Sequence, residues 1–267
     1  VNYEYHPIFV QATDEDEKKF AKATALMLSA IDPVRKIIID EEKFTLGYRG
    51  RLRAISMAEE KHERISEIFS HIQDKDHTII YCSDGKSCFE GTPRVNATEE
   101  IRHLEYILHL INTSCLSSVG SGKASKFTAT EDIQERMQLI DSFNKGYIEY
   151  LVAIRCLDEG INIPSIKSAL ILSSNDNYRE FVQRRGRILR LYPGKEKAHI
   201  YDVIVLPSIL NKAFAQIEFR RYFEYSRLAL NKDILVDKLE RLMSDYDLSY
   251  DDIKFNNDYV YGGDLDD

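Results

Sequence analysis

Short continuous apolar runs alternate along the middle of the chain with longer segments in which apolar residues recur at helical spacing. The short runs predict strands at residues 78–82, 126–130, 149–154, 166–172 and 198–206. The longer segments predict amphipathic helices at residues 57–73, 98–111, 133–143 and 177–189. Continuous apolar runs are typical of strands that are buried on both faces. Strands that alternate with such helices predict an α/β fold, with a mostly parallel sheet sandwiched by helices.

This pattern divides the chain into an initial segment, a central α/β domain, a helical extension and a tail, at residues 1–56, 57–207, 208–250 and 251–267. Apolar residues at helical spacing in the extension predict helices that either cover the sheet or dock on another domain. The tail is rich in aspartate and glycine, and we expect it to be mobile. Because the chain begins at Val1 rather than Met, we expect it to be a piece of a longer chain.

The initial segment is expected to hold a short extended run at residues 3–10, one helix and an irregular connector. Thr13 is the expected N-cap of the helix, and acidic residues follow it where the helix dipole favours them. Gly47 and Gly50 interrupt residues 31–55, which predicts a connector and no long helix there.

Composition and charge restrict the classes of partner. The chain has 267 residues and a formal net charge of −8, so any contact with nucleic acid requires a local basic patch. One basic cluster in the connector, Arg49, Arg51 and Arg53, belongs either to a solvated loop or to a nucleic-acid backbone contact. The four cysteines lack zinc-ligand spacing, which predicts free thiols in the cytoplasm and no metal site. No apolar run approaches the ~20 residues of a membrane span.

A second basic cluster lies between the last two predicted strands, at residues 180–190. Its four arginines surround Gly186 and are Arg184, Arg185, Arg187 and Arg190. A guanidinium is planar and permanently charged and binds phosphate oxygens in pairs, so arginines on one helix predict phosphoryl recognition.

The ligand crevice of a parallel α/β sheet lies at the carboxyl ends of its strands. We expect Ser83, Thr130 and the loops after residues 154 and 172 at this edge. The helix that carries the arginines leaves the last of these loops, so we expect the arginines to serve the same edge.

Residues 120–123 have the composition of a phosphate-binding loop but do not match its pattern. A P-loop requires glycine where Ser117 stands and Ser or Thr where Ala124 stands, and its strand precedes it. We therefore expect a flexible turn. The chain has arginines suited to a transferred phosphate but neither a nucleotide-anchoring loop nor a magnesium carboxylate. These features fit one lobe of a two-lobed motor whose other lobe anchors the nucleotide.

Four segments resemble conserved motifs of superfamily 2 helicases of the DEAD/DEAH type, in the same order. Residues 183–190 resemble the sixth motif, 153–164 the fifth and 78–83 the fourth, and 127–130 occupy the segment between the last two. The resemblance implies the C-terminal RecA-like domain of such a helicase. The Gln-Arg-x-Gly-Arg form is most similar to the branch of type III restriction-enzyme subunits and excision-repair helicases.

The resemblance also implies roles for residues of the sixth motif. Arg187 and Arg190 are the implied arginine fingers, which reach the γ-phosphate of an ATP held, with its Mg²⁺, mainly by the missing first lobe. Gln183 is implied to couple the nucleotide state to closure of the two lobes. Arg184 is implied to contact a carboxylate of the first lobe.

The other motifs imply contacts with the nucleotide and with DNA or RNA. In the fifth motif, Gly160 permits close approach of the backbone, and Asn162 stands where relatives often carry an aspartate that faces the ribose. Ser83, Thr128 and Thr130 are the implied contacts with the nucleic-acid backbone, and Thr130 is also an expected helix cap. Hydroxyl groups suit this role because translocation ignores base identity.

These features predict the second motor lobe of an ATP-dependent helicase or translocase. Its expected partners are nucleic acid and the N-terminal RecA-like lobe of the same protein, and the piece alone is expected to hydrolyse essentially no ATP. Two alternatives are a catalytically inactive helicase-like interaction module and a self-contained α/β enzyme that acts on a phosphorylated small molecule.

Overall fold

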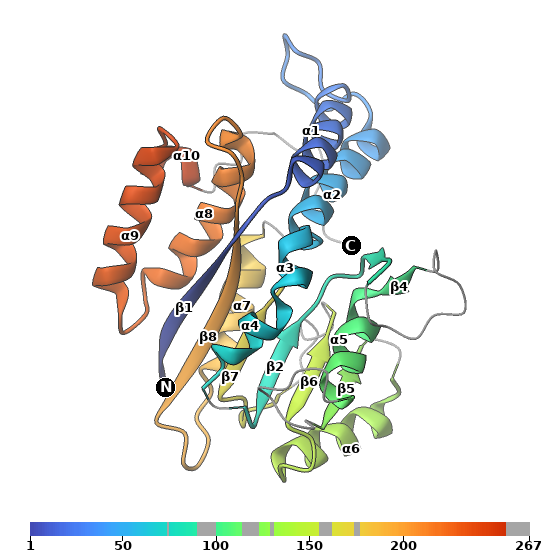
Figure 1. Ribbon diagram of the computed structural model, residues 1–267, viewed down its shortest axis with the longest axis vertical. Helices are drawn as coiled ribbons and strands as arrows, with labels where there is room; N and C mark the ends of the chain where they lie inside the picture. The colour runs from blue at the N-terminus through green and yellow to red at the C-terminus, as the bar shows by residue number, and fades with distance from the viewer. Residues whose placement is uncertain are drawn as a thin grey trace.

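Six parallel strands form the central sheet of this protein. The computed structural model describes residues 1–73, 75–89, 100–113, 123–128, 131–154, 162–173 and 177–254. The strand order is β1-β8-β7-β2-β6-β5, and every neighbouring pair is parallel. The strands are β1 (Asn2–Gln11), β2 (Thr78–Tyr81), β5 (Ala124–Phe127), β6 (Tyr150–Ala153), β7 (Ser168–Ile171) and β8 (Lys197–Leu206). The predicted fold class, a mostly parallel sheet flanked by helices, is confirmed (Figure 1).

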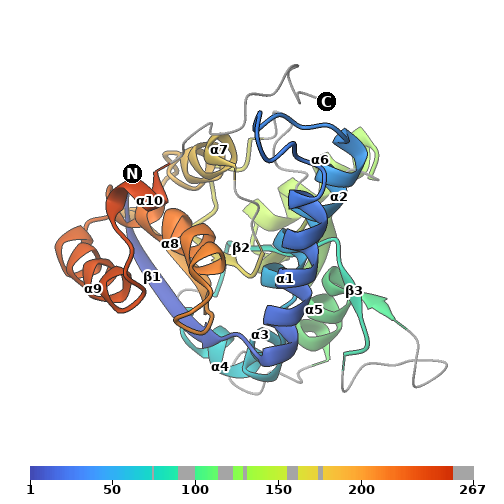
Figure 2. The same ribbon diagram turned by 90° about the horizontal axis from the view of Figure 1, so that it is seen from above.

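Helices contribute to two hydrophobic cores, one on each face of the sheet (Figure 2). The first core takes side chains from α6 (Ile133–Asn144), α7 (Tyr178–Ile188), α8 (Lys212–Ser226) and α9 (Lys232–Asp245). The second takes side chains mainly from α1 (Asp14–Leu28), α2 (Glu41–Ser56), α4 (Ile65–Ser70) and α5 (His103–Asn112). All residues of β2, β6 and β7 are buried, which explains their continuous apolar runs. Within the described part of the chain, no helix has the length and apolarity of a membrane span.

The first residues of the chain, predicted as a short extended run, form a full edge strand. β1 pairs with β8 along its whole length. Tyr3 and Tyr5 enter one core, and Ile8 and Val10 enter the other, as expected for a strand whose side chains alternate between faces. Residues 2–11 therefore belong to the same sheet as the central domain.

The prediction of a connector is wrong for residues 41–56, which form helix α2 packed against α1 (Figure 1). The two glycines that indicated a break face α1. A Cβ atom on Gly47 would lie 2.4 Å from the backbone nitrogen of Met27, and one on Gly50 would lie 2.9 Å from the Cβ of Ala23. Glycine allows the two helices to approach this closely because it has no side chain. The predicted N-cap Thr13 is confirmed, in a capping box with Asp16.

Other local predictions differ in detail. The predicted helix at residues 57–73 is two short helices, α3 (Glu59–Glu63) and α4, which meet at Arg64. The N-cap of α6 is Asp132 and not the expected Thr130, because Asp132 and Glu135 form a capping box. Residues after β2 form a small antiparallel pair, β3 (Lys86–Ser87) and β4 (Ile101–Arg102), so the helix predicted at residues 98–111 begins only at His103. Thr130, residues 120–122 of the predicted turn and residues 255–267 of the predicted tail lie outside the described residues.

The predicted helical extension covers the sheet, because α8 packs against β8 and β1. A buried ionic network joins them. The Arg221 Nε donates to both carboxylate oxygens of Asp202, at 3.2 and 3.1 Å, and its two Nη atoms donate to Glu218 at 2.6 and 2.9 Å. The Tyr5 hydroxyl donates to Asp202 at 2.9 Å. Burial raises the pKa of Asp202, and the Arg221 charge opposes this shift. Each buried charge thus has a partner, which is the condition for placing ions in a core.

Replacing Gly47 by alanine is expected to lower the free energy of unfolding by about 1–3 kcal/mol, because the added methyl group overlaps the Met27 backbone. The matched control is Gly186→Ala on α7, where no heavy atom outside the helix lies within 4 Å of the new Cβ. This control is expected to raise the free energy by about 0.5–1 kcal/mol through helix propensity. Urea denaturation measures both variants. Equal effects of the two substitutions would contradict the close approach at Gly47.

The stability of the protein is expected to depend on pH through Lys61 of α3, which is buried and donates to the Leu172 carbonyl at 2.9 Å. Burial lowers the pKa of its ammonium group to about 8, from 10.5. Between these values the unfolded chain keeps the proton that the folded chain has lost. The Lys61 contribution to stability therefore rises as the pH rises through about 8 and is lost as the pH falls through it.

The matched variant is Lys61→Met, which retains the aliphatic side chain and removes the titrating group. The unfolding free energy of the wild type, minus that of the variant, is expected to increase by about 2–3 kcal/mol between about pH 7 and pH 10. Taking the difference cancels the titration of the other groups. Denaturant titrations over this pH range test the expectation, and a difference that stays flat would contradict it.

Candidate functional site

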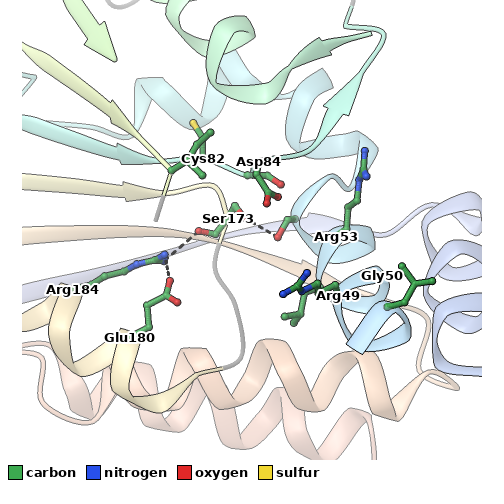
Figure 3. A pocket seen from close by; sticks show the side chains of 13 residues that line it. Arg49, Gly50, Arg53, Cys82, Asp84, Ser173, Glu180 and Arg184 are labelled. Carbon is green, nitrogen blue, oxygen red and sulfur yellow. Dashed lines mark hydrogen bonds and ion pairs between the residues drawn. The ribbon is translucent and has the colours of Figure 1, made fainter. Parts of the chain in front are cut away.

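A pocket of about 390 Å³ opens at the carboxyl ends of the central strands (Figure 3). Part of its wall comes from residues that follow β2, β6 and β7, namely Cys82, Ser83, Asp84, Ile154 and Ser173. Helices α2 and α7 supply the other lining residues. Neighbouring parallel strands end at the same edge of a sheet, so the topology brings these distant segments together. Ser83 and the segments after β6 and β7 thus lie at the predicted edge.

Hydroxyl and backbone groups fix the wall of this pocket. The Ser83 hydroxyl accepts a hydrogen bond from the Gly85 N–H at 3.0 Å, and the Ser83 N–H donates to the Nδ1 of His103 at 3.2 Å. The Ser173 hydroxyl donates to the hydroxyl of Ser56 on α2 at 2.8 Å. Burial raises the pKa of the Cys82 thiol, which therefore stays neutral. The strand ends thus form a polar wall, to which Asp84 adds an acidic side chain.

Arg184 lies at the pocket, but contacts within the lobe hold it in place. It forms an ion pair with Glu180, and its Nη1 donates to the Ser173 carbonyl at 3.4 Å (Figure 3). Its guanidinium carbon lies 4.5 Å from the centre of the Tyr81 ring. Arg185 is also buried and donates to the Glu224 carbonyl of α8 at 2.7 Å. These two arginines attach α7 to the sheet and to α8. Among the described residues, Glu180 of the same helix is a carboxylate partner of Arg184.

Two exposed arginines of α2 bring positive charge to the same pocket. Arg49 and Arg53 are one helical turn apart and both line it (Figure 3). Arg53 donates to the Lys86 carbonyl at 3.4 Å, whereas Arg49 has no hydrogen bond or ion pair within the described ranges. Arg51 contacts α1, because its guanidinium lies 4.9 Å from the centre of the Phe20 ring. The basic cluster predicted in a connector is therefore on a helix, and two of its members face the pocket.

Arg187 and Arg190 lie at the other end of α7, away from this pocket. The Arg190 Nη1 donates to the Oδ1 of Asn162, so the structure brings together two residues implied to contact the nucleotide. Both arginines are half-buried. The Nη1 atom of Arg187 is buried and has no hydrogen-bond partner among the described residues. Gln183 is exposed on the same helix and directly precedes Arg184. Asn162, Arg187 and Arg190 form a polar edge that we call the α7 end.

Lys195 fixes the backbone of the α7 end. Its Nζ donates to the carbonyl oxygens of Ile188 at 2.5 Å, Arg190 at 3.1 Å and Pro164 at 3.3 Å. A cation suits the C-terminal end of a helix, where carbonyl groups are unpaired and the dipole is negative. Burial lowers the pKa of Lys195 to about 8. The sequence analysis did not identify this residue, because its role depends on carbonyl groups that only the fold brings together.

Of the arginines in this stretch, Arg184 lines the pocket, whereas Arg187 and Arg190 are not among its lining residues. This difference follows from the length and direction of α7. Parallel β7 and β8 require the helix between them to run back along the sheet. Its 11 residues cover about 16 Å. Its last turn therefore lies near the starts of β1, β7 and β8, and the Val1 backbone nitrogen donates to the Leu189 carbonyl at 2.7 Å.

The remaining predicted contacts are engaged or lie outside the described part of the chain. The Thr128 hydroxyl donates to the Glu131 carboxylate at 2.9 Å, and its backbone N–H donates to the same group at 2.5 Å. Gly160 and Thr130 are outside the described residues. The structure therefore places Ser83 at the pocket and leaves the other two hydroxyl contacts as predictions.

Comparisons with known proteins agree with this architecture. Residues 60–192 match the family described as the helicase conserved C-terminal domain. The DNA 3′-5′ translocase XPB2 of Sulfurisphaera tokodaii is 21% identical over 204 residues, which cover 70% of this chain and 40% of that protein. The UvrABC system protein B of Leptospira biflexa is 34% identical over 98 residues, or 35% of this chain and 14% of that protein. The chain thus spans less than half the length of these relatives.

A solved structure shows the same fold. The Sulfolobus solfataricus SWI2/SNF2 ATPase core in complex with double-stranded DNA aligns with a TM-score of 0.52 at 14% identity, over 92% of this chain and 50% of that one. The parallel sheet, its flanking helices and the matched family lead to one conclusion. Residues 60–192 of this chain match the helicase conserved C-terminal domain, and the parallel sheet with its flanking helices has a RecA-like fold.

Proposed function

We propose that this chain is the second motor lobe of an ATP-dependent helicase or translocase that acts on DNA or RNA. In this proposal the α7 end completes an ATP site on the first lobe, and the pocket edge contacts the nucleic-acid backbone. The observation that carries it is the helicase-domain match over residues 60–192. This range contains the α7 end and the pocket-lining residues other than those of α2, whose exposed arginines Arg49 and Arg53 we call the α2 rim. The match to the XPB2 translocase supports a motor that moves along nucleic acid.

The donor set at the α7 end fits a triphosphate held by another lobe. Arg187 keeps a buried guanidinium nitrogen without a partner among the described residues, and Arg190 is oriented by Asn162. Leaving a buried donor unsatisfied costs roughly 1–3 kcal/mol, so a site that retains one is suited to an external acceptor. Guanidinium groups match phosphoryl oxygens in charge and geometry. Bound Mg²⁺–ATP would supply the phosphoryl group, with the metal held mainly by the first lobe.

Arginines placed at this end act on the charge that develops during hydrolysis. Negative charge spreads over the phosphoryl oxygens in the transition state, and fixed guanidinium groups stabilise it without having to reorganise. Lys195 holds the carbonyl oxygens of Ile188 and Arg190, so it positions the backbone that carries both arginines. Arg187 and Arg190 are therefore the proposed arginine fingers, and Asn162 orients Arg190. Gln183 is proposed to couple the nucleotide state to closure of the two lobes.

The pocket edge suits the phosphodiester backbone of a nucleic acid. Arg49 and Arg53 supply positive charge at an exposed rim, and the strand ends supply hydroxyl and backbone groups. Such groups bind phosphate and sugar without reading bases, as a translocating motor requires. Net charge cannot attract the nucleic acid, since the chain is acidic, so this local rim is the proposed contact.

Helix α7 links the two edges. Arg184 attaches one part of it at the pocket, while Arg187 and Arg190 lie at its end. Because these contacts fix α7 to the sheet, closure of the two lobes on ATP binding would carry both edges together. The closed and open states of the two lobes would then differ in their affinity for the nucleic-acid strand, and this difference drives stepping of the motor along it.

We also propose a place for this lobe in the branch that includes type III restriction and excision-repair helicases. The support is the Gln-Arg-x-Gly-Arg sequence of α7 and the similarity to the UvrABC system protein B.

Arg187→Ala in the full-length protein is expected to reduce ATP turnover by roughly 10³–10⁵-fold, the range known for arginine fingers. Nucleotide affinity is expected to change little, because the first lobe anchors the triphosphate. Steady-state ATPase assays and titration with a fluorescent nucleotide separate the two quantities. The control is Arg179→Ala, on the exposed first turn of the same helix, which should leave turnover unchanged. An equal loss of affinity and turnover in Arg187→Ala would contradict the assignment.

The double variant Arg49→Ala/Arg53→Ala is expected to weaken binding of nucleic acids of any sequence to a similar extent. Each lost phosphate contact lowers the slope of log K against log[salt] by about 0.7 for a single strand. Fluorescence anisotropy at several salt concentrations measures this slope. Arg241→Ala on α9, also an exposed arginine, is the charge-matched control. An unchanged slope in the double variant would exclude the rim as a backbone contact.

A further inference from the structure

Glu4, His6 and His199 come together on one face of the edge of the sheet. The parallel register of β1 and β8 places Glu4 opposite His199 and His6 opposite Tyr201. Glu4 and His6 are two residues apart on β1, so their side chains point to the same face. The two histidines are 193 residues apart in sequence. Cysteine spacing, on which the expectation of no metal site rested, carries no information about this cluster.

The three potential ligand atoms lie close to one another. The Nε2 of His6 and the Nδ1 of His199 are 3.0 Å apart. The Oε2 of Glu4 lies 3.8 Å from the former and 3.6 Å from the latter. A tetrahedral Zn²⁺ site with ligands at about 2.0–2.1 Å has ligand atoms about 3.3 Å apart. The observed spacings bracket this value, so shifts of a few tenths of an ångström are enough to seat an ion.

We propose that Glu4, His6 and His199 form a binding site for one divalent transition-metal ion, with Zn²⁺ as the preferred ion, which joins β1 to β8. Two imidazole nitrogens and one carboxylate oxygen form a donor set that zinc accepts, and they leave a fourth position for water. Imidazole ligands also favour zinc over Mg²⁺ or Ca²⁺, which prefer oxygen ligands. This inference does not depend on the proposed function.

Neighbouring side chains orient Glu4, His6 and His199 for binding a metal ion. The Glu4 Oε1 accepts from Lys197 Nζ at 2.8 Å, which orients the carboxylate and leaves Oε2 directed at the histidines. The His6 ring stacks on Tyr201 with ring centres 4.8 Å apart, and His199 is buried. Such outer contacts fix the orientation of ligands and raise affinity. The Lys197 side chain is 46% exposed, so solvent screens its charge from a bound cation.

Metal binding changes a contact that the protein already makes. The histidine nitrogens now share one hydrogen bond, so one of them carries a proton. With a metal ion between them, each ring carries its proton on the other nitrogen, and the ion takes the place of the shared proton. The ion would thereby connect the exposed edge strand to its neighbour near the starts of both strands, where Glu4 and His199 are paired.

The test is a Zn²⁺ titration of the metal-stripped chain, produced without a histidine tag, against a chromogenic chelator. We expect one Zn²⁺ per chain, and we expect the affinity to fall at least tenfold in Glu4→Gln and in His6→Ala. Glu4→Gln keeps the size of the side chain, so circular dichroism should show an intact fold. His109→Ala, on α5 and outside the cluster, is the control and should bind as the wild type does.

Co²⁺ provides a second readout, because four-coordinate cobalt absorbs visible light far more strongly than six-coordinate cobalt. The wild type is expected to give the strong band, and Glu4→Gln is expected to lose it while remaining folded. No stoichiometric binding by the wild type would overturn the proposal. Equal affinity in the wild type and both ligand variants would also overturn it, because binding would then be located elsewhere on the chain.

Discussion

The placement of helix α7 by buried cations is the constraint on which both edges of this domain depend. Arg184, which is paired with Glu180 of the same helix, holds α7 to the strand ends through the Ser173 carbonyl, and Arg185 holds it to α8. Lys195 holds its last turn through backbone carbonyl oxygens. Every one of these cations is buried and has a specific acceptor, so movement of the helix would expose charges or leave them unpaired. The helix is therefore a rigid element between two surfaces.

This arrangement separates arginines that attach the helix from arginines that are available to a ligand. In one short stretch, Arg184 and Arg185 are buried and donate to acceptors within the fold. Arg187 instead retains a buried donor nitrogen without a partner among the described residues. The parallel topology produces this division, because a helix that returns along the sheet presents its two ends to different edges. The chain is acidic overall but presents arginines at the α2 rim and at the α7 end.

The sequence predicted the layers of the fold well and the tertiary contacts poorly. Fully buried strands such as β2 and β7 appear as continuous apolar runs, so local patterns were sufficient to find them. Gly47 was interpreted as a break in helical structure, but it lies inside α2. A glycine stands there because α1 packs too closely for a side chain. Lys195 and the pair of His6 with His199 have no local signal, because each depends on groups distant in sequence. The motif residues were found by resemblance, but their division between two edges required the structure.

A structure of the full-length protein bound to a single strand and to ADP with a fluoroaluminate analogue of the transferred phosphoryl group tests the central claim most directly. The predicted result is that the guanidinium of Arg187 crosses the cleft and lies at a hydrogen-bonding distance of about 2.7–2.9 Å from the fluoroaluminate. Arg190 should lie beside it and remain oriented by Asn162. An α7 end that faces solvent, with both arginines far from the analogue while the lobes are closed, would contradict the claim.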